Sequence, residues 1–277
     1  MKIYIIGGQS RLAISLANKY EKDSLVLLNR SLYSGWSKPG AKDLVSRFFE
    51  KCSDKGSIIF VTSGLLDPNL NYEDLLRINY HLPKNIIDGV RYLGMRVVTF
   101  GTVLERSLQP KNNYVASKLA LSSYIASLDA TCQTTNHLQL HTLFGIGQPN
   151  RFMFLGQILS ALKKNRPFFM ISGGQLREYH HYDDEAEAIK LTVNSPLSGI
   201  ITLSHGNPID LNSIANSIFN AFGKKELLHS IEEVEPDNSI YEKSFPKNTV
   251  IKNEFRDPLT SIVSHMKEAY RHAKQEN

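Results

Sequence analysis

Short apolar runs alternate with amphipathic segments through the first half of the chain. Continuous β-branched or leucine-rich runs occupy Ile3–Ile6, Leu25–Leu28 and Ile58–Val61, a pattern typical of strands that are buried on both faces. Apolar residues at helical spacing follow the first run, at Leu12, Leu16 and Ala17. Further helices are expected at 74–92 and 114–128, and further strands at 96–100 and 138–143. This order predicts an α/β fold of the Rossmann type, with a doubly wound parallel sheet.

The pattern changes after residue 149. It predicts helices at Phe154–Lys164, Leu211–Phe222 and Pro258–Lys274, with strands at 168–171 and 200–203 and a turn at 172–174. We therefore expect a larger lobe over residues 1–150, to which the chain returns later, and a smaller C-terminal α/β lobe over residues 151–277.

Composition narrows the class of protein. The 277 residues are 42% apolar and 21% charged, which is typical of a folded soluble chain. The opening apolar run is too short for a signal peptide, and no stretch of ~18 apolar residues occurs, so we expect a cytoplasmic protein without a membrane segment. The net charge of +5 comes from scattered residues, which favours a small anionic ligand over nucleic acid. The only two cysteines, Cys52 and Cys132, suit a reducing compartment.

A glycine-rich turn follows the first expected strand. It contains Gly7, Gly8, Gln9, Ser10, Arg11 and Leu12. Backbone N–H groups at such a strand-to-helix turn can hold a pyrophosphate, although the G-x-x-G-x-x-G pattern has Ser10 and Ala13 in place of its later glycines. Serine still admits a phosphate and alanine still permits close packing, but a plain turn would also look like this. The sequence predicts a dinucleotide-binding turn here.

Two other segments follow expected strands at the same sheet edge. Asn29-Arg30 stands where an acidic residue would bind the adenosine ribose of NAD, and an arginine there can pair with a 2′-phosphate instead. This favours NADP, with NAD as the alternative; Arg30 as an ordinary surface residue is the simpler explanation. Thr62, Ser63 and Gly64 end the third strand and are expected to line the cofactor.

Tyr114 and Lys118 carry the clearest chemical signal. Four residues apart on an expected helix, they lie on one face, where the ammonium would lower the pKa of the phenol and make it a usable acid or base. A Tyr-x-x-x-Lys pair by itself is common on helix surfaces. Its context, after the strand at 96–100 and the turn Gly101-Thr102, favours a catalytic pair.

These segments together resemble the extended short-chain dehydrogenase/reductase family, in particular its nucleotide-sugar epimerases, dehydratases and 4-ketoreductases. The first turn, Ile78-Asn79-Tyr80, the segment 99–102, the Tyr114–Lys118 pair and Leu143–Pro149 occur in the family's order. Gln175–Asp184 is similar to the family's Arg-Asp-Phe-x-x-Val-x-Asp segment. The resemblance implies that residues 1–150 bind NAD(P) and that residues 151–277 mainly bind substrate.

The resemblance also implies residue roles. Tyr114 is the general acid/base, Lys118 also binds the nicotinamide ribose, and Asn79 supports the lysine. A strict register with the family's Ser-Ser-x-x-Val-Tyr-Gly turn puts Phe100 at the catalytic hydroxyl position, so Thr99 or Thr102 must supply the group. Thr102 is preferred because it follows the glycine and is nearer the Tyr114 helix.

The substrate is implied to be a nucleotide-diphosphate sugar. Arg177 would reach its diphosphate, and His141 is a further substrate-binding candidate. A salt bridge with neighbouring acids is the simpler role for Arg177. The resemblance also implies a homodimer.

The pair His180-His181 does not predict a metal site. Neighbouring histidines in an extended stretch point to opposite faces, and no Cys or further His is close in sequence to complete a ligand set. One histidine is expected to line the pocket, and Asp183 or Asp184 to cap a helix over 185–191.

One activity of the family is excluded, and three functions remain open. Val103 and Leu104 occupy the place of the Asp-Glu pair of the family's dehydratases, which excludes that activity. The Arg30 signal favours a 4-keto-sugar reductase in surface polysaccharide biosynthesis, and an epimerase with tightly bound NAD is the alternative. A non-catalytic cofactor sensor on the same fold is the third, although such members generally lose the tyrosine or lysine.

Overall fold

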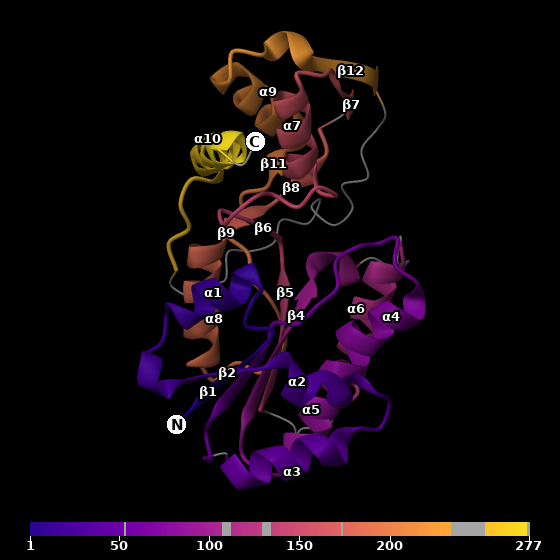
Figure 1. Ribbon diagram of the computed structural model, residues 1–277, viewed down its shortest axis with the longest axis vertical. Coiled ribbons are helices and arrows are strands. Elements are labelled where there is room, and N and C mark those ends of the chain that lie inside the picture. The colour runs from indigo at the N-terminus through magenta and orange to yellow at the C-terminus, as the bar shows by residue number, and fades with distance from the viewer. Residues whose placement is uncertain (53, 107–111, 129–133, 173, 234–252, 276–277) are drawn as a thin grey trace. The chain divides into compact units, whose positions relative to one another are not determined.

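The computed structural model describes residues 1–52, 54–106, 112–128, 134–172, 174–233 and 253–275 (Figure 1). Cys132 and Gly173, the middle residue of the turn expected at 172–174, lie outside these residues. The chain forms two compact units. The first contains Met1–Leu140 and Ala186–Leu203, and the second contains His141–Glu185 and Ser204–Asn277. The chain therefore leaves the first unit after Leu140 and returns to it at Ala186.

The first unit is built on a six-stranded sheet. Its order is β10-β5-β4-β3-β1-β2, and every pairing is parallel. The strands are β1 (Ile3–Ile6), β2 (Leu25–Leu28), β3 (Ile58–Val61), β4 (Arg96–Thr102), β5 (Thr135–Leu140) and β10 (Gly199–Thr202). This confirms the predicted Rossmann-type α/β fold. The chain passes from β1 to β2 on one side of β1 and then from β2 to β3 on its other side, so the carboxyl ends of β1 and β3 form the switch point where such sheets bind ligands.

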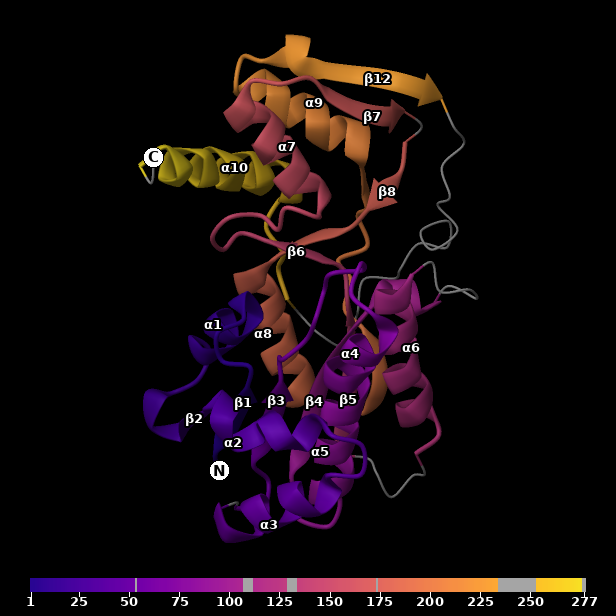
Figure 2. The same ribbon diagram turned by 45° about the vertical axis from the view of Figure 1, so that its right-hand side comes forward.

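Helices cover both faces of this sheet. They are α1 (Arg11–Ala17), α2 (Arg30–Tyr33), α3 (Lys42–Cys52), α4 (Tyr72–Leu76), α5 (Leu82–Val90), α6 (Asn113–Ala126) and, from Ala186 on, α8 (Tyr182–Val193). The described residues of this unit also form 3-10 turns at Lys22–Ser24, Ser34–Ser37 and Val103–Arg106. Helices α1 and α8 lie on one side of the sheet and α6 on the other (Figure 2).

The single helix expected at 74–92 is divided into three parts. Between α4 and α5 the chain forms a π-helical turn at Arg77–His81. Pro83, at the start of α5, has no N–H to donate to a preceding turn, which favours such an irregularity. The strand expected at 138–143 is likewise divided, because β5 ends at Leu140 and a new strand begins at Thr142.

Side chains along each strand of the first unit point alternately to the two faces of the sheet. Val97 of β4 belongs to the core cluster that includes Leu121 and Ile125 of α6. Because side chains alternate along a strand, Thr99 and Gly101 lie on the same face as Val97. Polar positions of β4 are thus directed toward the side that carries α6.

The second unit is a smaller α/β lobe. Its helices are α7 (Phe154–Lys164), α9 (Leu211–Ala221) and α10 (Pro258–Gln275), with a 3-10 turn at Lys225–Leu227. Three strand pairs accompany them: β6 (Thr142–Phe144) with β9 (Tyr179–His181), β7 (Phe168–Ser172) with β12 (Leu228–Glu233), and β8 (Leu176–Arg177) with β11 (Ile209–Asp210). Ile158, Ile214, Phe219 and Met266 are fully buried in its core. In the described part of the chain, every helix is too short or too polar to cross a bilayer.

Candidate active site

Tyr114 and Lys118 lie in the first turns of α6. Asn112 caps this helix, because its side chain accepts a hydrogen bond of 3.0 Å from the Val115 N–H. Lys118 is 7% exposed, and its Nζ donates to the Phe100 carbonyl of β4 at 2.8 Å. The lysine is therefore directed at the carboxyl end of the sheet rather than into solvent.

The ionisation of this pair departs from expectation. Burial lowers the pKa of Lys118 to about 8, although the Glu105 carboxylate opposes this shift. Burial, and then Glu105, raise the pKa of Tyr114 above its ordinary value. The sequence predicted that Lys118 would lower the pKa of Tyr114, and the structure gives the opposite direction. The main reason is burial, which disfavours the charged phenolate, and the Glu105 charge adds to this effect.

The two threonine candidates have different surroundings. Thr99 is 1% exposed, and its hydroxyl lies 2.8 Å from His137 Nδ1. Thr102, the last residue of β4, is half-buried, and its hydroxyl accepts from the Leu104 N–H at 3.3 Å. Phe100 stacks on Phe60 and offers only its carbonyl to Lys118. Of the two threonines, Thr102 is therefore the one whose hydroxyl lies at the carboxyl end of β4 and does not contact His137.

Asn79 is buried within the π-helical turn. Its Nδ2 donates to Ser117 Oγ and to the Leu65 carbonyl, each at 3.0 Å, and its Oδ1 accepts from the Leu65 N–H at 2.9 Å. It thus joins α6 to the loop after β3. π-helical turns are frequent at functional sites, and here the turn brings a buried amide beside the lysine helix.

The predicted cofactor residues converge at the switch point. Gly7 has φ +91°, and a Cβ there would lie 2.5 Å from the Ser63 N, so glycine alone allows this approach. The Thr62 hydroxyl donates to the Ile6 and Gly7 carbonyls at 2.9 and 3.1 Å. A Cβ on Gly64 would lie 3.7 Å from Lys118 Nζ. The glycine turn, the loop after β3 and the lysine therefore share one sheet edge, which fits a dinucleotide.

The remaining turn residues are placed as follows. Ser10 caps α1 by accepting from the Ala13 N–H at 3.1 Å, Gln9 is exposed, Gly8 and Arg11 are partly exposed, and the Leu12 side chain is buried. Asn29 and Arg30 are exposed after β2, where Asn29 caps α2. Since β2 pairs with β1 in parallel, both ends lie at the same edge of the sheet.

Arg177 and His141 belong to the second unit. Arg177 is half-buried in β8, and its Nη1 donates to the Leu176 carbonyl at 2.6 Å. The His141 side chain is fully buried, with Nε2 at 3.7 Å from Glu178 Oε2. His141 thus lies in a histidine–glutamate cluster within this unit.

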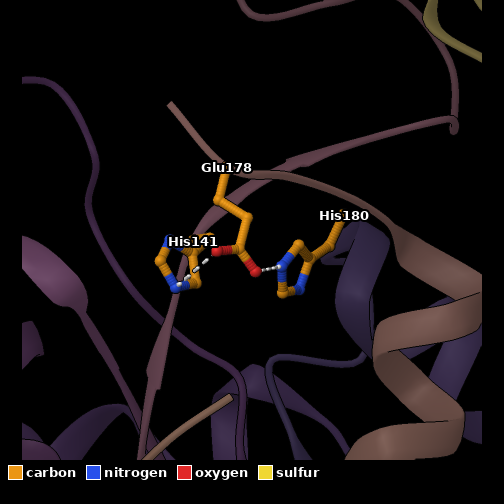
Figure 3. A group of neighbouring side chains, drawn as sticks. All are labelled: His141, Glu178 and His180. Atoms are coloured by element: carbon orange, nitrogen blue, oxygen red, sulfur yellow. Dashed lines mark hydrogen bonds and ion pairs between the residues drawn. The ribbon is translucent and has the colours of Figure 1, made fainter. Parts of the chain in front are cut away.

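Figure 3 shows three members of this cluster: His141, Glu178 and His180. His180 Nε2 lies 2.8 Å from Glu178, and its Nδ1 is hydrogen-bonded to Glu185. His205 approaches Glu178 to 3.6 Å. The sequence predicted that His180 and His181 point apart, and they do: His181 is partly exposed against Phe144. It missed that two distant histidines surround Glu178.

The glutamates and histidines of this cluster shift one another's pKa values toward the charged forms. Burial opposes ionisation of Glu178, but the hydrogen bond from His180 and the nearby histidines lower its pKa to about 2. Burial alone would lower the pKa of His180, whereas Glu185 and Glu178 raise it to about 9. At neutral pH both His180 nitrogens therefore donate to carboxylates. Although the residue types can ligate a metal ion, this geometry favours a proton between the carboxylates.

The expected cap of the following helix is wrong. Helix α8 begins at Tyr182, so Asp183 and Asp184 lie in its first turn. The His181 Nδ1 lies 3.2 Å from the Asp183 N–H and accepts from it, which is the role expected of a capping aspartate. Asp184 instead pairs with Arg256 at 2.6 Å.

Sequence reasoning also missed Glu105 and His137. Both side chains are fully buried in the first unit, and His137 Nε2 lies 3.0 Å from Glu105 Oε2. The available signal was the alternation in β5, where polar His137 and Gln139 are separated by apolar Leu138. Such spacing indicates a polar stripe on one strand face.

The chain is similar to known proteins in family and in fold. The family model described as the NAD dependent epimerase/dehydratase family matches residues 41–201, more than half of the chain. A search of curated protein sequences gives no match.

Solved structures share the fold. GDP-mannoheptose C4 reductase from Campylobacter jejuni, MlghC with NADP bound, is 18% identical with a TM-score of 0.73 over 99% of this chain and 98% of that one. UDP-N-acetylglucosamine 4-epimerase from Bacillus cereus is 17% identical, with a TM-score of 0.68 over 97% and 99%. DesIV, the dTDP-glucose 4,6-dehydratase of Streptomyces venezuelae with NAD and TYD bound, is 13% identical, with a TM-score of 0.73 over 100% and 98%. At these identities the likeness establishes the fold.

Proposed function

The chain belongs to the NAD dependent epimerase/dehydratase family, of the extended short-chain dehydrogenase/reductase type, and on this premise we propose that it is a 4-keto-sugar reductase acting on a nucleotide-diphosphate sugar. The observation that carries the proposal is the placement of Lys118: its Nζ lies at the Phe100 carbonyl and beside Gly64, at the sheet edge formed by the glycine turn. Tyr114 shares its helix face.

The same edge suits a dinucleotide. Gly7–Leu12 would receive the pyrophosphate, Thr62–Gly64 would line the cofactor, and Asn29-Arg30 would lie at the adenosine ribose. Arg30 favours NADP, with NAD as the alternative. The family model matches residues 41–201, so Gly7–Leu12 and Asn29-Arg30 lie before the matched range. The choice between NADP and NAD therefore rests on the chemistry of these residues.

The chain's own groups perform the proton transfer. The bound nicotinamide supplies a hydride to the sugar carbonyl carbon when the ketone becomes an alcohol. Tyr114 gives its phenolic proton to the carbonyl oxygen, and Thr102 orients that oxygen by hydrogen bonding. Lys118 holds the nicotinamide ribose, and Asn79 fixes the helix that carries the pair. A raised pKa keeps the Tyr114 phenol protonated and suits it to act as the acid.

The nucleotide-sugar substrate is assigned to Arg177, a bidentate donor for a diphosphate, and to His141. Val103 and Leu104 follow Thr102 where a dehydratase would carry acids. An epimerase with tightly bound NAD is the second candidate, and a cofactor sensor the third. A role in surface polysaccharide biosynthesis, a cytoplasmic location and a homodimer complete the proposal, on the family resemblance alone.

The decisive experiment assays purified protein with NADPH and a panel of nucleotide 4-keto sugars. Tyr114→Phe removes the proton donor, so kcat should fall by about 10²–10⁴-fold while the Kd for NADPH stays nearly unchanged. Tyr124→Phe is the matched control, since Tyr124 lies on the same helix with its hydroxyl on Asp88. Full turnover by Tyr114→Phe would refute the proposal, and NADPH binding without turnover in wild type would support the sensor. Turnover without net NADPH consumption would identify the epimerase.

The NADP assignment has its own test. Arg30→Ala should raise the Kd for NADPH about tenfold and leave NADH little changed, because only NADPH carries a 2′-phosphate. Fluorescence titration of both cofactors measures the difference. Equal weakening of both would remove the basis for choosing NADP.

A further inference from the structure

Glu105 is a carboxylate that the proposed reaction does not use. It lies in the 3-10 turn Val103–Arg106, directly after β4, and its side chain is fully buried. Three donors satisfy it: the Thr102 N–H at 2.8 Å to Oε1, and His137 Nε2 and Gln139 Nε2 at 3.0 and 3.2 Å to Oε2. A carboxylate is tolerated in a protein interior only with such partners, so this position is built for the charge.

The sheet provides the space for this side chain. A Cβ on Gly101 would lie 2.3 Å from Glu105 Oε1 and 2.4 Å from His137 Nε2, so any larger residue would displace the pair. In the register of β4 with β5, Thr99 is opposite His137 and Gly101 is opposite Gln139. The polar stripe therefore lies on the sheet face that carries α6.

Hydrogen bonding continues through His137. Its Nε2 faces the Glu105 carboxylate, which can only accept, so Nε2 donates there, and its Nδ1 is hydrogen-bonded to the Thr99 hydroxyl at 2.8 Å. One end of this network is thus the buried Thr99, and the other is the backbone of Thr102. The network holds the turn that presents the Thr102 hydroxyl.

The same carboxylate acts on the catalytic pair by charge. It raises the pKa of Tyr114 and opposes the burial that lowers the pKa of Lys118. Lys118 Nζ donates to the neutral Phe100 carbonyl, and Glu105 is the negative charge that acts on this buried ammonium.

We infer that Glu105 is a positioning residue of this active site, which holds the Thr102 turn through its backbone N–H and places a buried carboxylate on the sheet face that carries the helix of Tyr114 and Lys118. The inference rests on the proposed function. The arrangement favours the direction in which Tyr114 gives a proton to a ketone, since the negative charge stabilises the neutral phenol.

The test titrates Lys118 directly. Lysine labelled with ¹³C at Cε reports the Lys118 pKa, with Lys118→Met assigning the signal. Glu105→Gln keeps the acceptor for Thr102 but removes the charge, so the Lys118 pKa should fall by about one unit or more. Glu105→Asp keeps the charge and should leave the Lys118 pKa near that of wild type, while its shorter reach releases Thr102 and lowers kcat.

Thr99→Val is the control for a merely structural effect, because it cuts the far end of the network and leaves the charge in place. A shift in Glu105→Gln with none in Thr99→Val supports the inference. Equal shifts in both, or none in either, overturn it. If Glu105→Gln does not fold, unchanged kcat in Glu105→Asp overturns the inference and a fall in kcat with an unchanged Kd for NADPH supports it.

The proposed function is tested separately from the role of Glu105. A wild-type protein that binds no NADPH and reduces none of the keto sugars removes the reaction, whatever the titrations show. In that case a shifted Lys118 pKa would describe only a buried ion pair, and the positioning role would fall with the reaction.

Discussion

Each of the two units contains a buried glutamate beside a histidine, and the two networks differ in what they contact. In the first unit Glu105 accepts from one backbone N–H, one imidazole and one amide. In the second unit Glu178 accepts from His180, the Ser204 hydroxyl and the His205 N–H, and His180 is also held by Glu185. The second network pairs its charges with one another, whereas the first directs its charge at Tyr114 and Lys118.

The difference lies in where each charge acts. In the Glu178–His180–Glu185 chain one imidazolium is shared by two carboxylates, so most of the charge is offset within the chain, and we expect this chain to contribute mainly to stability. Glu105 instead raises the pKa values of Tyr114 and Lys118. Residue type alone does not distinguish the two networks, and variants in each should.

The largest expected effect is the loss of Glu178. Glu178→Ala leaves the buried His180 paired only with Glu185, and should lower the free energy of unfolding by about 3–5 kcal/mol. Urea unfolding followed by circular dichroism measures the loss. Glu187→Ala is the control, because the Glu187–Lys19 pair is partly exposed and contributes about 0–1 kcal/mol. Equal losses in the two variants would contradict a paired charge cluster.

The pH dependence of stability sharpens the same contrast. Because Glu178 and Glu185 raise the pKa of His180 to about 9, folding binds this proton more tightly than the unfolded chain does. Its contribution is complete below about pH 6.5 and is lost as the pH rises through about 9, at up to about 1.4 kcal/mol per pH unit. Tm measured from pH 6 to 10 should fall, and Glu185→Gln should flatten the curve. A curve that stays steep in Glu185→Gln would assign the loss to another group.

In the first unit the corresponding test is steric. Gly101→Ala puts a methyl group against Glu105 and His137 and should cost about 1–3 kcal/mol, because neither buried side chain can move without losing a hydrogen bond. Gly35→Ala is the matched control, since its Cβ would meet only Leu44 at 3.8 Å. Chemical denaturation of both variants compares the two sites. A neutral Gly101→Ala would mean that the Glu105 network can relax.

The main strands could be predicted because continuous apolar runs are a local signal. Ile3–Ile6, Leu25–Leu28 and Ile58–Val61 are strands with the expected bounds, and helix Phe154–Lys164 is also as predicted. Helix 74–92 was predicted whole because a single π-helical turn leaves the segment helical and shifts the apolar spacing too little to be recognised in the sequence. The Asp183 and Asp184 cap was wrong because a histidine ring performs that role.

The networks could not be predicted because they depend on register. Glu105 and His137 are 32 residues apart and meet only when β4 and β5 pair with Thr99 opposite His137. His141 and His205 reach Glu178 from separate segments of the second unit. The Tyr114–Lys118 pair was different, since its four-residue spacing is itself the geometry on a helix.

The smallest expected effect comes from removing one of the hydrogen-bond donors to Glu178. Ser204→Ala removes one of the donors to Glu178, at 3.0 Å, and should cost about 0.5–1.5 kcal/mol. The cost stays small because His180 and the His205 N–H still hold the carboxylate. Tm at pH 7 and at pH 9 measures it, and the loss should be similar at both, since the serine carries no proton that titrates in this range. A loss much larger at pH 9 would show that the serine replaces the His180 proton as the main partner of Glu178, and the cluster would then be held by hydrogen bonds rather than by charge.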